Sequence, residues 1–258
     1  SVCNHPVEME SRIDAARLAA PVAFEQRCGP DAHSRERRGC YLGPVDGISI
    51  EDARAWRIGY HAAVALIDEQ VGRVIETLRE QGLDQDTLVL FTSDHGDMLG
   101  DHGLFIKGAY FFDPCVRVPL IAWGRGAHKG ATDELCQLHD IAATALLAGG
   151  FSEQEVRSWM PDGRDLRRPE LLRERGYAAC VYRNSGICVD RERNTRGYFD
   201  PPIHATMWRE GRFKLNVYHT SARGADEGEL YDMQQDRLEL TNLWDCAQMR
   251  AVRERLTR

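Results

Sequence analysis

Several features that define specialised protein classes are missing from these 258 residues. No apolar run approaches the roughly 20 residues of a membrane-spanning helix, and the first residues lack the pattern of a signal peptide. Positive charge is not in excess, because 33 Lys and Arg stand against 40 Asp and Glu. A general nucleic-acid binder would need a basic face. We therefore expect a cytoplasmic protein that binds neither nucleic acid nor a membrane.

The eight cysteines include no Cys-x-x-Cys pair, and their spacing is irregular. Zinc knuckles and thioredoxin-like redox sites need such closely spaced pairs. Without a secretion signal, reduced thiols are the expected state. The length corresponds to one or two domains.

One long amphipathic helix is predicted over residues 51–81, after an irregular segment at 1–48 that contains many Pro and Gly residues. Ser49 and Asp52 form a capping-box pattern, and Gly82 is a natural stop. Apolar residues then recur at steps of three and four: Trp56, Tyr60, Ala63, Ile67, Val71, Val74 and Leu78. This stripe predicts a helix that packs on another element, most simply a sheet.

Two apolar runs of strand length follow, at 87–92 and 118–123. Unbroken runs of this kind favour strands buried on both faces of a parallel sheet. Pro119 must then stand at the beginning of its strand or on an edge. A helix is predicted at 141–147, with Asp140 as its N-cap.

The C-terminal third has the pattern of a small antiparallel sheet. Short strands are predicted at 177–183, 204–209, 212–219 and 229–232, and Glu210-Gly211 is a hairpin turn signal. Helix–strand alternation followed by clustered strands indicates an α/β fold. We expect three parts: an irregular segment at 1–48, an α/β core at 49–170 and an antiparallel subdomain at 171–258.

Residues suited to bind a cation and an anion stand directly after the first predicted strand. Ligands bind outside the carboxyl ends of strands in open α/β sheets, which is where Asp94 and His95 would lie. The adjacent pair offers one oxygen and one nitrogen ligand to a divalent ion, and Lys107 suits a phosphate or sulfate oxygen. A capped turn and a solvated lysine remain the alternative explanation from spacing alone.

The run from Thr92 to Lys107, with Arg-Val-Pro-Leu-Ile at 117–121, resembles the second signature region of the sulfatases. These belong to the alkaline-phosphatase superfamily, which also contains the phosphonate monoester hydrolases. Residues 60–74, 162–166, 211–215 and 229–233 extend the resemblance to about residues 50–245. It implies part of an alkaline-phosphatase-like sandwich, with a mostly parallel sheet flanked by helices, and then a small antiparallel sheet.

The resemblance also implies roles for individual residues. Asp94 and His95 would be two ligands of a single divalent cation, with Ca²⁺, Mn²⁺ or Mg²⁺ favoured and Zn²⁺ left open. Lys107 would hold an oxygen of a sulfate or phosphonate ester and stabilise the leaving oxygen. The matching Asp97, Asp101 and His102 are assigned to loop architecture or supporting hydrogen bonds.

Two parts of a complete sulfatase site have no counterpart in the sequence. There is no Cys-x-Pro-x-Arg or Ser version to supply the nucleophile, and no Asp-Asp pair to supply further metal ligands. Cys28 comes nearest but lacks the Arg, and His5-Pro6 is a candidate remnant of a family histidine. We expect a sulfuric ester hydrolase by ancestry, or secondly a phosphonate monoester hydrolase, without turnover in this chain alone. The alternative is a non-catalytic paralogue that binds a metal, an anion or a partner chain; a homo-oligomer is also open.

Overall fold

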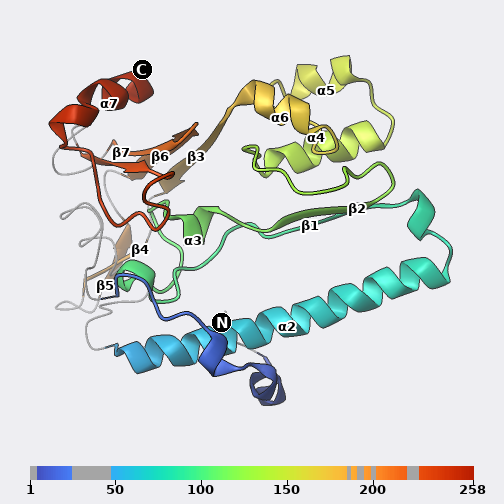
Figure 1. Cartoon of the computed structure of the whole chain (residues 1–258), viewed down its shortest axis with the longest axis horizontal. Helices are drawn as coiled ribbons and strands as arrows, with labels where there is room; N and C mark the ends of the chain where they lie inside the picture. The colour runs from blue at the N-terminus through green and yellow to red at the C-terminus, as the bar shows by residue number, and fades with distance from the viewer. Residues whose placement is uncertain (1–4, 25–47, 185–186, 191–194, 199–201, 220–226) are drawn as a thin grey trace.

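The computed structural model describes residues 5–24, 48–184, 187–190, 195–198, 202–219 and 227–258 (Figure 1). The N-terminal part contains the short 3-10 helices η1 (Val7–Arg12) and η2 (Ala15–Arg17). The long helix α2 (Ile50–Glu80) comes next and is followed by η3 (Asp84–Asp86). None of the helices in these ranges is long and apolar enough to cross a membrane.

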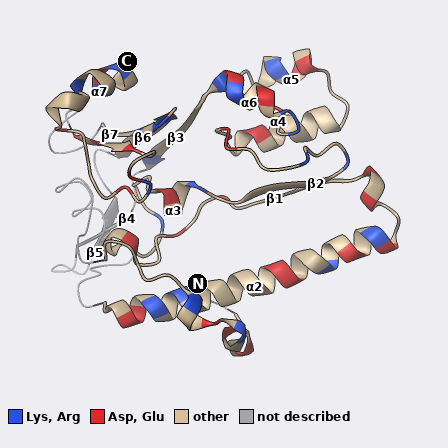
Figure 2. Ribbon diagram, in the orientation of Figure 1, with Lys and Arg blue, Asp and Glu red and all other residues tan. Residues whose placement is uncertain are grey.

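Helix α2 confirms the prediction at both ends. Ser49 Oγ accepts a hydrogen bond from Asp52 N at 3.1 Å, and Ser49 N donates to Asp52 Oδ2 at 2.9 Å. At the other end Gly82 adopts a φ of 65°, a conformation that favours glycine. Only the first half of the helix is well covered, because Ile67 is 51% and Val74 58% exposed. Figure 2 shows both signs of charge along its whole length.

Strands β1 (Leu88–Thr92) and β2 (Leu120–Gly124) form a two-stranded ribbon that lies between α2 and the helices α4–α6 (Figure 1). The ribbon is antiparallel, with Leu88 opposite Gly124 and Thr92 opposite Leu120. The predicted parallel pairing is therefore wrong for the strands that the structure describes, which all pair antiparallel. The expected burial on both faces is also wrong, because all five residues of β1 are only partly buried and Ile121 of β2 is 57% exposed. An apolar run alone does not determine strand direction. Pro119 directly precedes β2, as predicted.

A group of short helices lies beside the ribbon (Figure 1): α4 (His139–Ala148), α5 (Glu153–Trp159) and α6 (Pro169–Arg175). Asp140 was expected to cap α4, but Leu138 is the N-cap residue and Asp140 lies inside the helix, fully buried. Its two oxygens accept hydrogen bonds from Arg175 Nη1 and Nη2 at 2.7 and 2.9 Å. The carboxylate binds an arginine that lies 35 residues further along the chain. Local sequence patterns do not reveal a partner at this distance.

The predicted C-terminal antiparallel sheet is confirmed. Its strand order is β3 (Tyr177–Asn184), β6 (Ile203–Glu210), β7 (Phe213–Tyr218) and β8 (Gly228–Asp232). The hairpin β4 (Ile187–Asp190)–β5 (Thr195–Tyr198) stands apart from it. One face of the sheet packs on Phe111, and the other packs through Leu215 and Leu230 on Trp244 and on helix α7 (Arg250–Thr257), which follows η6 (Ala247–Met249).

Candidate active site

The loop that leaves β1 is held against the short helix α3 (Asp113–Val116). Gly96 N donates to the carbonyl of Cys115 at 2.8 Å. A Cβ atom on Gly96 would stand 2.0 Å from the carbonyl oxygen of Pro114, closer than any side chain tolerates. Only glycine fits at this contact, so Gly96 fixes where the chain turns directly after His95.

The same loop doubles back so that Lys107 returns to the end of β1. Leu99 N donates to the carbonyl of Phe105 at 2.9 Å, and Gly100 N donates to Leu104 at 2.7 Å. Asp97 Oδ1 accepts a hydrogen bond from Lys107 N at 2.9 Å. Asp97 thus closes the loop and anchors the backbone of Lys107, the supporting role expected of it.

The structure brings Asp94, His95 and Lys107 together around a single nitrogen atom. Lys107 Nζ lies 2.8 Å from His95 Nε2, and Asp94 Oδ2 lies 3.4 Å from the same atom. The side chain of Asp94 is 84% exposed and that of His95 is 35% exposed. Three chemical groups from the two ends of one loop therefore converge at the surface, where a solute can reach them.

Hydrogen bonds define the protonation of these groups. His95 Nδ1 lies 3.0 Å from the carbonyl oxygen of Gly96, which only accepts, so Nδ1 carries the hydrogen. The neutral ring then presents the lone pair of Nε2 outward. The backbone N–H of His95 donates to Asp94 Oδ1 at 3.0 Å. This hydrogen bond lowers the pKa of Asp94, which keeps the carboxylate charged.

Comparison with known proteins identifies the family. Residues 30–151 match the Sulfatase family model. The chain belongs to the sulfatase family. It is 33% identical over 204 residues to the choline-sulfatase of Rhizobium meliloti, covering 76% of this chain and 34% of that protein. It is 31% identical over 215 residues to the arylsulfatase of Clostridium perfringens, covering 81% of this chain and 40% of that protein.

A solved structure extends the likeness to the fold. The phosphonate monoester hydrolase from Silicibacter pomeroyi matches 98% of this chain and 51% of its own, with a TM-score of 0.73 and 25% identity. The predicted alkaline-phosphatase-like α/β fold is confirmed in outline. The chain spans between a third and about half of the length of these three proteins.

Asp94 and His95 fit part of a metal site. Both atoms that face outward, a carboxylate oxygen and an unprotonated imidazole nitrogen, are donors for a divalent ion. Within the described residues, no group of three or more His, Cys, Asp or Glu side chains stands close enough to hold an ion. Two donors bind a cation weakly, so further ligands are needed for a complete coordination sphere.

The remaining motif residues, Asp101 and His102, hold the loop through contacts with neighbouring segments. Asp101 Oδ1 accepts hydrogen bonds at 2.6 Å from both Val22 N and Arg57 Nη2. Buried His102 stacks on Phe112 with ring centroids 4.1 Å apart. Burial lowers the pKa of His102. The sequence analysis did not predict that Arg57, on α2, binds Asp101. The only sequence feature that could have indicated this contact is a charged residue within a mainly apolar stretch of the helix.

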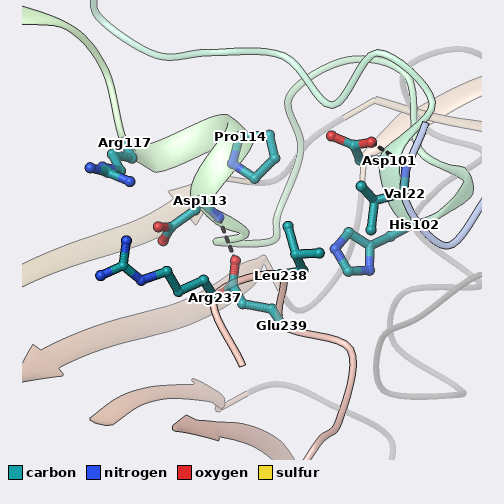
Figure 3. A pocket seen from close by; sticks show the side chains of 9 residues that line it. All are labelled: Val22, Asp101, His102, Asp113, Pro114, Arg117, Arg237, Leu238 and Glu239. Atoms are coloured by element: carbon teal, nitrogen blue, oxygen red, sulfur yellow. Dashed lines mark hydrogen bonds between the residues drawn. The ribbon is translucent and has the colours of Figure 1, made fainter. Parts of the chain in front are cut away.

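A cavity of about 270 Å³ lies where this loop meets α3 and the segment after β8 (Figure 3). It is lined by Val22, Asp101, His102, Asp113, Pro114, Arg117, Arg237, Leu238 and Glu239. Beside it, buried Lys214 lies 2.8 Å from Asp113 Oδ1 and 2.6 Å from Glu239 Oε1. Burial raises the pKa of Glu239 to about 7, although Lys214 opposes this. These contacts tie the C-terminal sheet to α3, and sequence reasoning found none of them.

Proposed function

We propose that this chain is part of a hydrolase that cleaves sulfate monoesters, or phosphonate or phosphate monoesters, with the help of one divalent cation. The observation that carries the proposal is the convergence of Asp94, His95 and Lys107 on one exposed nitrogen at the end of β1. Sulfatase relatives and the phosphonate monoester hydrolase support the choice of substrates.

The residues of the chain have separate roles in this proposal. Asp94 Oδ2 and His95 Nε2 are the two ligands that the chain contributes, and Gly96 orients the imidazole through its carbonyl. Lys107 binds a non-bridging oxygen of the ester and stabilises the negative charge that develops on the leaving oxygen. The cation, with Ca²⁺, Mn²⁺ or Mg²⁺ favoured, acts as a Lewis acid when bound.

We further propose that the isolated chain does not turn over substrate. The sequence has no Cys-x-Pro-x-Arg, no Ser version of it and no Asp-Asp pair. A covalent mechanism cannot proceed without its nucleophile. The second candidate, a non-catalytic paralogue that binds a metal, an anion or a partner chain, is favoured by the same observation.

Calorimetric titration of the purified chain with Mn²⁺ and Ca²⁺ tests the cation-binding part. Saturable binding that is lost in Asp94→Ala but kept in Asp133→Ala, an exposed aspartate outside the loop, is the expected result. Binding that persists unchanged in Asp94→Ala refutes the ligand assignment. Measurable hydrolysis of 4-nitrophenyl sulfate or phenylphosphonate by the chain alone refutes the predicted lack of turnover.

A further inference from the structure

The lone pair of His95 Nε2 accepts a hydrogen bond from Lys107 in this structure. Nδ1 carries the ring hydrogen, which points to the carbonyl of Gly96. Nε2 therefore has one lone pair, and Lys107 Nζ donates to it from 2.8 Å. A lone pair that accepts a hydrogen bond from an ammonium group cannot coordinate a cation at the same time.

The carboxylate of Asp94, the other proposed cation ligand, lies next to the same nitrogen atom. Asp94 Oδ2 lies 3.4 Å from the same Nε2 atom. The Lys107 ammonium thus contacts His95 Nε2, the atom that would bind a divalent ion together with Asp94 Oδ2. We propose that Lys107 and the divalent cation compete for His95 Nε2, so that cation binding releases the ammonium toward the substrate. This inference rests on the proposed function, because it takes Asp94 and His95 as ligands.

The loop allows this movement without a backbone rearrangement. Asp97 holds the backbone N–H of Lys107, and the residue itself is exposed. Its four-carbon side chain can therefore swing while its Cα atom stays in place. The displaced ammonium remains tethered beside the cation ligands, which is where a sulfate or phosphonate oxygen would need it.

Under competition for one lone pair, the apparent association constant of the cation is its intrinsic value multiplied by the fraction of molecules in which Nε2 is free. A charge-assisted hydrogen bond at a partly exposed site is worth about a tenfold change in a binding constant. Removing the ammonium should therefore tighten Mn²⁺ binding roughly tenfold. A residue that only supports the fold would weaken the site when removed.

The test compares wild type, Lys107→Met and the control Lys129→Met, an exposed lysine outside the loop, by Mn²⁺ calorimetry. The titrations are run at low salt and at about 0.5 M NaCl, where repulsion between exposed charges is largely screened. Tighter binding by Lys107→Met at both salt concentrations, with Lys129→Met unchanged, is the expected result. A gain that vanishes at high salt overturns the inference in favour of simple charge repulsion.

The inference and the proposed function can fail separately. If wild type binds Mn²⁺ through Asp94 but Lys107→Met binds no more tightly, the competition is refuted and the ligand assignment stands. If neither protein binds Mn²⁺, both are refuted. A ¹⁵N NMR measurement without metal adds an independent readout: the His95 Nε2 resonance should shift in Lys107→Met, and an unchanged resonance contradicts the hydrogen bond.

Discussion

Glu239 gives the chain a stability that depends on pH in a direction unusual for a carboxylate. The side chain is 1% exposed, and burial raises its pKa to about 7 from an ordinary 4.5. The folded chain therefore holds the proton more tightly than the unfolded chain does. The resulting stability is fully present below pH 4.5 and is lost as the pH rises to about 7.

The variant Glu239→Gln isolates this contribution. A glutamine keeps the shape of the side chain and an oxygen that can accept from Asp113 N, as Glu239 Oε2 does at 2.6 Å. Lys214 keeps the carboxylate of Asp113 as its partner at 2.8 Å. The change in pKa corresponds to about 3 kcal/mol, so the variant should gain up to that amount relative to wild type between pH 4.5 and 8.

Urea unfolding of both proteins, followed by circular dichroism at several pH values from 4.5 to 8, measures this gain. Comparing the two proteins at each pH cancels the titration of all other groups. A constant offset between them would reflect the altered contact with Lys214 and leaves the reasoning intact. The pH-dependent part decides the question: the reasoning is refuted if the advantage of the variant does not grow as the pH rises from 4.5 to 8, whatever constant offset accompanies it.

Two other substitutions test single contacts. Gly96→Ala should lower the free energy of unfolding by several kcal/mol and weaken Mn²⁺ binding, because the new Cβ atom would collide with the Pro114 carbonyl. Gly72→Ala is the control: no atom lies within 4 Å of the Cβ position in α2, so this change should raise the free energy of unfolding by about 1 kcal/mol. Equal effects of the two in urea unfolding would contradict the close approach at Gly96. Asp140→Ala should cost about 3–5 kcal/mol, because it leaves Arg175 charged and buried without its carboxylate. A loss below about 1 kcal/mol in the same assay would show that water reaches Arg175.

The parts of the fold that the sequence predicts well are those with local signals. The capping box at Ser49 and the stop at Gly82 mark the ends of α2 within one residue. The strands at 203–210 and 213–218 follow from alternation and the turn around Gly211. Such signals depend on neighbours in the chain. The boundaries of the three expected parts stay predictions.

Features that depend on distant partners could not be predicted in the same way. The direction of the pairing between β1 and β2 is decided by the path of the chain between them. The role of Asp140 is decided by Arg175, and that of Glu239 by Lys214 and Asp113. In each case the residue type fits more than one local role, and the tertiary partner selects one.

The candidate site combines both kinds of information. The candidate side chains Asp94, His95 and Lys107 were predicted from two signals: their position after a strand and the resemblance to the sulfatases. A supporting role for Asp97 was expected, but the sequence did not predict that its partner would be the backbone of Lys107 or that Lys107 Nζ would lie 2.8 Å from His95 Nε2. The residue types suggest a metal ligand set, and the geometry adds that one of its donors is occupied by a neighbouring lysine. Cation affinity in this chain should therefore depend on Lys107 as well as on the two ligands.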